Sequence, residues 1–401
     1  MTRVLCLLAA TLLLGACTEK LTAPGECPGL CPSDNLEVRD TVITATRDSG
    51  YVGFVPAGGG SRLLAANGHA GLDLIPIIRF ARAVDSITIE DTLRPAIVDS
   101  VLLFVTVTLR DPAATGLALD FYKLPPAVTT DSGTTHAEVA AALVPERLVA
   151  SVPLPDTLTN GEVGVVLAGA DLERLAFAPE DDKVLRLAYR LQGPTPTGIG
   201  IASQAGGATA PGFVSYMRVV LPDTTISRTI PRTIQYGSFV SSAPADAPSP
   251  DELPLGGWPS RRAILRFELS PMLRDTARII RATLELTPTE PIAALPGDTV
   301  RLDVRGVFSD LGPKSPRISG NGGALIHTRI LTNGSTAPVP IEVSRIATLW
   351  NGNSGVPPVL MVTIAPEAAT FGTARFGSSR MPGLEPRLRL TYAMPYPFEV
   401  Q

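Results

Sequence analysis

A short apolar motif containing an arginine occurs twice in this chain and constrains its fold more than any other feature. The segment Ile77-Ile78-Arg79-Phe80 recurs as Ile264-Leu265-Arg266-Phe267. Each copy follows a polar loop, and each is followed by a long apolar-alternating run, 98–110 in the first copy and 279–287 in the second. Recurrence at so long a spacing is typical of a duplicated domain and not of a short-period solenoid.

The end of each copy carries a further matching motif of small residues. Its spacing between copies is slightly shorter than that of the first motif, which indicates insertions and deletions in loops. We therefore predict two domains, 41–222 and 223–394, followed by a C-terminal tail, 395–401. The closing motifs are Ile201-Ala202-Ser203 with Pro211-Gly212-Phe213, and Phe376-Gly377-Ser378 with Pro386-Arg387-Leu388.

Secondary structure within both copies is predicted to be mostly strand. Apolar and polar residues alternate along 284–287, 301–305 and 387–392, as expected for strands with one buried face. The chain contains 38 Pro and 36 Gly, so connections should be turns, with helices limited to 137–148 and 169–175. We predict an all-β fold of two tandem antiparallel β-sandwich domains, each jelly-roll-like, because long helical crossovers for an α/β fold are missing.

Composition agrees with a folded, exported protein. The chain is 45% hydrophobic and 18% charged, which supplies enough apolar material for real cores and excludes disorder of the whole chain. The net charge of −4 argues against a nucleic-acid partner, because binding to phosphate backbones needs positive charge.

The first residues predict export and a lipid anchor. A basic residue precedes an apolar run, 4–14, that is shorter than the ~20 residues a membrane-spanning helix needs. The following Leu14-Gly15-Ala16-Cys17 resembles the lipobox of bacterial lipoproteins, in which the signal peptide, 1–16, is removed and the cysteine is acylated. The resemblance implies lipidation of Cys17 and, because Thr18 and not Asp follows, an outer-membrane location on its periplasmic or surface face. A soluble secreted protein is the alternative.

The segment 17–40 is interpreted as a flexible tether, because it is rich in Pro, Gly and short polar residues and has no apolar periodicity. It contains Cys27 and Cys31, separated by Pro, Gly and Leu. Neighbouring cysteines outside the cytosol tend to oxidise, so we predict a disulfide between them. Two free thiols remain an alternative, as does a metal site, although no His or further Cys lies nearby to complete about four ligands.

Five runs of the second predicted domain share one family pattern: 262–270, 279–286, 346–350, 376–380 and 386–392. Through them the domain resembles the DNRLRE-type β-sandwich domains of bacterial surface proteins over residues 224–393. The first domain fits less well, because Ala81-Arg82 follows Phe80 where that family has an acidic residue and Leu. The resemblance implies a jelly-roll fold and an association with carbohydrate binding or surface display, and it implies no catalytic residues.

The two tryptophans are the candidates for sugar contact, because an aromatic ring can stack on the apolar face of a pyranose. Trp258 lies in Gly256-Gly257-Trp258-Pro259, a loop context that would expose it. Plugging the end of a sandwich is the alternative role for this residue. Trp350 follows an apolar run and is expected to pack. Arg79 and Arg266 are expected to be structural, with glycan contact as the alternative.

Enzyme signatures are missing from the sequence. His69, His136 and His327 are scattered and belong to no metalloprotease or nucleophile motif. The acidic run Glu180-Asp181-Asp182 leaves open a structural calcium loop or paired glycosidase carboxylates. We nevertheless predict no catalytic residue, no resident metal and no cofactor.

Two functions from different classes remain at this point. The first is a membrane-anchored, non-catalytic binding protein for polysaccharide. The second is a structural or display lipoprotein without a small ligand, which mediates surface assembly or protein–protein contact.

Overall fold

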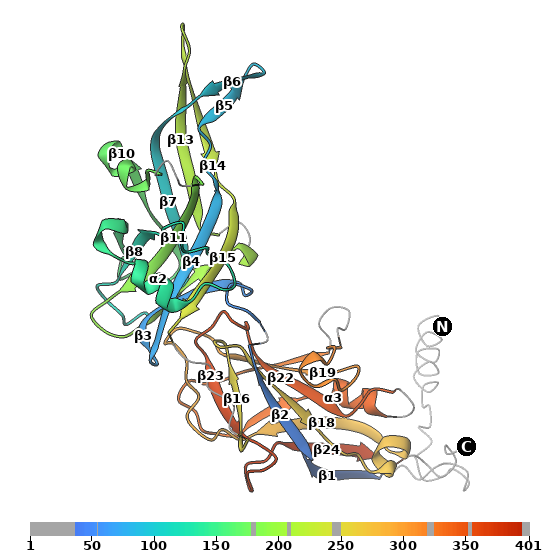
Figure 1. The fold of residues 1–401 in the computed structure, drawn as a ribbon. Helices are drawn as coiled ribbons and strands as arrows, with labels where there is room; N and C mark the ends of the chain where they lie inside the picture. The colour runs from blue at the N-terminus through green and yellow to red at the C-terminus, as the bar shows by residue number, and fades with distance from the viewer. Residues whose placement is uncertain are drawn as a thin grey trace, which may run out of the picture.

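The computed structural model describes residues 37–53, 55–177, 182–206, 210–242, 250–318, 325–351 and 355–394. These residues form several antiparallel sheets with few helices, which confirms the predicted all-β class. Figure 1 shows two lobes, one above the other. We call them the upper lobe, residues 62–241, and the lower lobe, residues 38–52 and 252–393.

The upper lobe is built on one curled eleven-stranded sheet in the order β14-β13-β7-β12-β3-β4-β11-β8-β9, with β10 paired to β7 and β15 to β4. The pair β5–β6 forms a separate hairpin at the far end (Figure 1). Its strands are β3 (Arg62–His69), β4 (Leu72–Arg82), β5 (Ser86–Ile89), β6 (Thr92–Pro95), β7 (Ile97–Arg110), β8 (Ala118–Lys123), β9 (Leu148–Pro153), β10 (Gly161–Ala168), β11 (Val184–Gln192), β12 (Gly198–Ala202), β13 (Gly212–Val220), β14 (Thr225–Pro231) and β15 (Ile234–Ser241).

The lower lobe is a sandwich of two sheets, one in the order β1-β24-β18-β21 and one in the order β20-β19-β22-β17-β16-β23, with β2 paired to β17. One apolar core fills the space between them and includes Leu265, Leu284 and Val362. Its strands are β1 (Val38–Thr44), β2 (Arg47–Val52), β16 (Glu252–Gly256), β17 (Arg261–Arg266), β18 (Arg278–Leu286), β19 (Arg301–Gly306), β20 (Ile326–Ile330), β21 (Val339–Glu342), β22 (Val359–Ala365), β23 (Thr373–Gly377) and β24 (Arg387–Ala393).

Strand alternation explains why these segments bury one face. Along β24, Leu388 and Leu390 are buried while Arg387 and Arg389 are exposed. The predicted strands around 284–287 and 301–305 are also present, as β18 and β19. Asp303 on β19 departs from the simple pattern, because it is buried and accepts a hydrogen bond from Thr328 at 2.9 Å.

The two lobes resemble each other in strand order. Apart from β5 and β6, the strands of the upper lobe have counterparts in a similar order in the lower lobe, although β12 pairs with both β7 and β3 while its counterpart β23 pairs only with β16. The motif strands β4 and β17 occupy corresponding central positions. The other corresponding pairs are β3 and β16, β7 and β18, β8 and β19, β9 and β20, β10 and β21, β11 and β22, β12 and β23, β13 and β24, β14 and β1, and β15 and β2.

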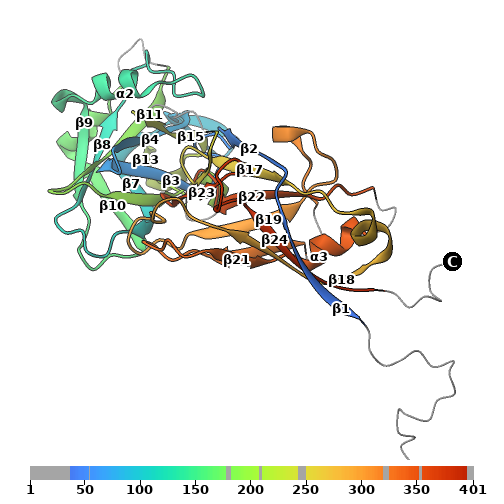
Figure 2. The same ribbon diagram turned by 90° about the horizontal axis from the view of Figure 1, so that it is seen from below.

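The strand pairing runs across the boundary expected at residues 222 and 223. Strands β1 and β2 are the first two strands of the described residues, but they hydrogen bond to β24 and β17 of the lower lobe. Strands β14 and β15 follow residue 222 but complete the upper lobe beside β13 and β4. The upper lobe is thus an insertion between β2 and β16, and Figure 2 shows β1 and β2 among the late strands.

Helical segments are short and lie at the edges of the sheets. The helix predicted over 137–148 is α2 (His136–Ala142), which ends early because Pro145 lacks an N–H and restricts the residue before it. The predicted segment 169–175 is a 3₁₀ helix, η2 (Gly169–Leu175). In the described ranges the other helical turns are η1 (Pro145–Arg147), η3 (Gln204–Gly206), η4 (Met272–Thr276), η5 (Gly312–Lys314), α3 (Ser344–Ala347) and η7 (Thr348–Trp350).

Candidate functional site

The loop between β16 and β17 carries Trp258 at the junction of the two lobes. Gly257 precedes it, and a side chain there would collide with the carbonyl oxygen of Thr370, at 2.1 Å from the Cβ position. The Gly257 N–H donates to the carbonyl oxygen of Gly372 at 2.9 Å. On the other side, the hydroxyl of the buried Ser260 accepts a hydrogen bond from the Val55 N–H at 2.8 Å. These contacts hold the tryptophan loop in one position.

Trp258 is half-buried, so its ring both packs against the fold and keeps part of its surface accessible. Its ring meets the buried ring of Phe239 edge-on, with centroids 4.5 Å apart, and packs against the upper-lobe core. It also lines a groove of about 490 Å³, which we call the Trp258 groove. The groove is lined by Pro56, Ala57, Ile77, Asp131, Ser132, Thr134, Thr135, His136, Tyr236, Ser238, Phe239, Val240, Ser241 and Trp258.

The aromatic part of the groove comes from β15 and the tryptophan loop. Tyr236 on β15 is half-buried, and the guanidinium of Arg79 lies 5.9 Å from its ring centroid. Arg79 also donates to the carbonyl oxygen of Thr129 at 3.2 Å. Arg79 therefore packs on the tyrosine and holds the 129–131 loop that borders the groove.

The polar rim comes from the loop before α2. Asp131 is exposed, and its carboxylate accepts a hydrogen bond from the Gly133 N–H at 2.8 Å. This backbone hydrogen bond, with a further one from the Thr129 side chain, lowers the pKa of Asp131, so the group is ionised at neutral pH. Thr135 begins α2 with a capping box, in which its hydroxyl accepts from the Glu138 N–H.

His136 joins the rim to the sheet beneath. Its Nε2 atom lies 2.9 Å from the Asp73 carboxylate, so the imidazole is oriented by a residue of β4.

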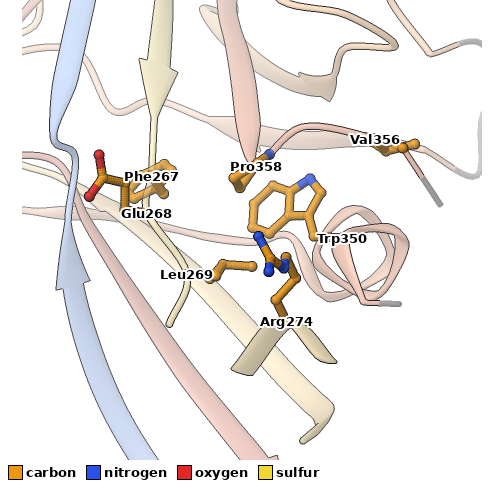
Figure 3. Close-up of a pocket in the computed structure, with 8 residues that line it drawn as sticks. Phe267, Glu268, Leu269, Arg274, Trp350, Val356 and Pro358 are labelled. Carbon is orange, nitrogen blue, oxygen red and sulfur yellow. The ribbon is translucent and has the colours of Figure 1, made fainter. Parts of the chain in front are cut away.

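A larger cavity, about 660 Å³, lies at the end of the lower lobe around Trp350. Trp350 is only 2% exposed and belongs to the core, which confirms that it packs. Figure 3 shows Leu269 and Arg274 beside its ring, with Pro358 on the other side. The indole Nε1 atom is buried and has no hydrogen-bond partner among the described residues.

Arg79 and Arg266 have the structural role expected of them. Arg266 pairs with Asp310 through two hydrogen bonds, one of 2.8 Å between Nη2 and Oδ1. This pairing, together with Tyr51, raises the pKa of Arg266, and it lowers the pKa of Asp310. Both arginines stand at corresponding positions of β4 and β17.

Several predicted residues lie outside the described ranges. Cys17, Cys27 and Cys31 are among them, as are Glu180 and Asp181 of the acidic run. Asp182 is described, and both of its carboxylate oxygens accept hydrogen bonds from Arg186, at 3.1 and 2.7 Å. The described part of the chain holds no group of three or more His, Cys, Asp or Glu placed to bind a metal ion.

No protein-family model, curated protein or solved structure matches this chain. In the described ranges, each helix is too short or too polar to cross a bilayer.

The sequence pointed to Trp258 but not to its neighbours in the groove. Asp131 and His136 come from one segment and Tyr236 from another, and only the fold brings these two segments beside Trp258. A local signal existed for one part of the rim, since Thr135 and Glu138 have the spacing of a capping box and mark a helix start.

Proposed function

We propose that this chain is a membrane-anchored lipoprotein that binds polysaccharide in the Trp258 groove without catalysing a reaction on it. The observation that carries the proposal is the pairing of two half-buried aromatic side chains, Trp258 and Tyr236, with an exposed polar rim in one groove. The volume of about 490 Å³ lies within the ~300–1,000 Å³ typical of small-molecule sites.

The chemistry of the groove suits a sugar. Aromatic rings offer an apolar surface for the C–H face of a pyranose. Asp131, Thr135 and the His136 imidazole supply acceptors and donors for hydroxyl groups around that surface. An open groove, in contrast to a closed cavity, also leaves room for a polymer to continue beyond the bound unit.

Binding can be tested with the Cys17→Ser chain, which we expect to be soluble. Affinity electrophoresis through gels that contain neutral or acidic polysaccharides, together with a glycan array, should show retardation by at least one polymer. Trp258→Ala should weaken that binding by roughly tenfold, because a stacked ring contributes about 1 kcal/mol beyond its buried area. Tyr216→Ala removes a 39% exposed aromatic on β13 outside the groove and should change nothing.

Three results would contradict this function. They are failure of every polymer to retard the protein, equal binding by the Trp258→Ala variant, and release of new reducing ends from a bound polymer. Trp258→Phe keeps a ring against Phe239 and should retain part of the binding, which separates loss of stacking from loss of folding.

The anchor is a separate part of the proposal. Several acyl chains hold a protein on a membrane far better than one chain does. Cys17→Ser should therefore release the protein into the periplasm or medium, and labelled fatty acid should mark the wild-type chain only. Persistent membrane association of the variant would count against lipidation.

A structural or display role is the second candidate, and the far end of the upper lobe favours it. Apolar side chains there are exposed, including Leu93 (66%) and Val220 (63%). Strands β5 and β6 and the β13–β14 hairpin project at this end (Figure 1). Under this alternative, no polysaccharide binds, and polar substitutions at Leu93 and Val220 abolish association with a protein partner.

A further inference from the structure

A second cavity in the upper lobe, of about 340 Å³, is mostly apolar. It lies between η2 and the ends of strands β7, β11 and β13, apart from the Trp258 groove, with which it shares no lining residue. The apolar side chains that line it include Val98, Val101, Leu175, Phe177, Leu185 and Phe213.

Three charged residues also line this cavity, and two of them neutralise each other. The Lys183 ammonium lies 2.7 Å from the Asp85 carboxylate, and both side chains are largely exposed at the rim. The third residue, Arg232, has no carboxylate partner among the described residues. Its Nη1 atom is buried without a hydrogen bond, and its guanidinium lies 4.3 Å from the centroid of the Phe213 ring.

The position of Arg232 is fixed by the backbone. It sits between β14 and β15, and its N–H donates to the carbonyl oxygen of Phe213 at 2.8 Å. Burial alone lowers the pKa of Arg232 to about 10, so the group still carries its charge at neutral pH. A half-buried cation without a partner destabilises a fold, and residues that do so are concentrated at functional sites.

The corresponding cavity of the lower lobe offers a contrast. It also lies beyond the end of its motif strand, next to helical residue Trp350. The arginine in its lining, Arg274, pairs with Asp275 at 2.8 Å. Of these two cavities, only the one in the upper lobe is lined by an arginine that has no carboxylate partner among the described residues.

We propose that the upper-lobe cavity binds a free monocarboxylate with an apolar tail of medium length, such as a fatty acid. The tail would lie against the Val, Leu and Phe side chains, and the carboxylate would accept two parallel hydrogen bonds from Arg232. A volume of about 340 Å³ is at the lower end of the range for small-molecule sites, so it suits one chain and not a phospholipid.

The probe is decanoate, titrated at pH 7 into the Cys17→Ser chain by calorimetry. Decanoate should bind, and decanol and decyltrimethylammonium should bind at least roughly tenfold more weakly, because neither has the negatively charged pair of oxygens that a guanidinium binds. Equal binding of decanol, or binding only in the presence of phosphatidylcholine vesicles, would overturn the proposal.

Arg232→Leu supplies a test with two opposed readouts. It should weaken decanoate binding by roughly tenfold or more and at the same time raise the melting temperature by a few degrees, because an uncompensated charge is replaced by an apolar side chain. Arg228→Leu removes an exposed arginine of β14 and should change neither property.

Arg232→Lys keeps the charge but loses the planar fork, and should bind decanoate with intermediate affinity. If Arg232→Leu and the wild type bind decanoate equally, the proposed site is wrong. Trp258→Ala should leave decanoate binding intact, so failure of the polysaccharide proposal and failure of this one are distinguishable.

Discussion

The guanidinium of Arg79 lies over the ring of Tyr236, 5.9 Å from its centroid, and joins a strand of the motif to a strand from the far side of the expected domain boundary. Its second contact, with the Thr129 carbonyl oxygen at 3.2 Å, fixes the loop that carries Asp131. Arg79 thus supports both the sheet and the rim of the Trp258 groove.

Replacing Arg79 should therefore affect stability and binding together. Arg79→Met leaves the Thr129 carbonyl without its donor and should lower the free energy of unfolding by about 1 kcal/mol, measured by urea denaturation. Polysaccharide binding should weaken as well, because the 129–131 loop loses its attachment. Arg82→Met, at an exposed position of the same strand, should do neither. If the two substitutions change stability and binding equally, the contacts of Arg79 with Tyr236 and Thr129 do not have the proposed role.

The loop of Trp258 offers a test based on a single methyl group. Gly257→Ala would place a Cβ atom 2.1 Å from the Thr370 carbonyl oxygen, so the loop must shift. We expect a loss of about 1–3 kcal/mol in unfolding free energy and weaker polysaccharide binding. At Gly237 on β15 the nearest atom to a new Cβ is 3.8 Å away, so Gly237→Ala should change stability by less than about 0.5 kcal/mol. A Gly257→Ala protein that matches this control would refute the packing argument.

The Arg266–Asp310 pair predicts a pH dependence of stability. The hydrogen bond from Arg266 lowers the pKa of Asp310 in the folded state, so its stabilising contribution is present above the ordinary carboxyl pKa and is lost as the pH falls through the lowered value. Asp310→Asn should cost about 1–3 kcal/mol at pH 7, and its difference from wild type should shrink in acid. Thermal unfolding of both proteins between pH 7 and pH 2 measures this.

Asp275 provides the matched control for that series. It also pairs with an arginine, at 2.8 Å, but both side chains are about half exposed. Asp275→Asn should change stability by less than about 1 kcal/mol at any pH, because solvent screens exposed pairs. A constant difference between wild type and Asp310→Asn across the pH range would contradict the assigned cause.

The strand pairing predicts which piece of the chain folds alone. A fragment 55–242 contains every strand of the upper lobe, whereas a fragment 41–222 of similar length lacks β14 and β15. Without β15, fragment 41–222 leaves one edge of β4 unpaired and lacks Phe239, which is buried in the core. We expect 55–242 to unfold cooperatively on heating and to resist limited proteolysis, and 41–222 to be digested or to aggregate. Comparable resistance of the two fragments to proteolysis would contradict this prediction.

Much of the fold could be predicted because it depends on local alternation. The runs that became β18, β19 and β24 alternate between apolar and polar residues, and that pattern is set by the side chains themselves. The recurring motif also lies on corresponding strands, β4 and β17. Position along the chain, however, does not decide which sheet a strand joins. Tyr51 lies on β2 and Tyr236 on β15. Only the long-range pairing shows that each of these strands joins a sheet on the other side of the expected boundary, β2 beside β17 and β15 beside β4.

The groove was harder to predict than the fold for a similar reason. Trp258 stood out because tryptophan is rare here and sits among glycines. Asp131 and His136 are ordinary residues of a polar loop, and their value depends on lying beside a tryptophan more than a hundred positions away. The sequence did not point to Arg232 either, because the lack of a hydrogen-bond partner for a charged group can be recognised only from the positions of its neighbours in the fold.

The insertion of the upper lobe between β2 and β16 means that the polypeptide passes between the lobes twice, once on each side of 62–241. Two domains joined by a single linker can rotate freely about it. Here two backbone connections join the lobes, so rotation of one lobe relative to the other must move both connections at once. The two lobes would then keep a set orientation relative to each other, and the Trp258 groove at their junction would keep its shape.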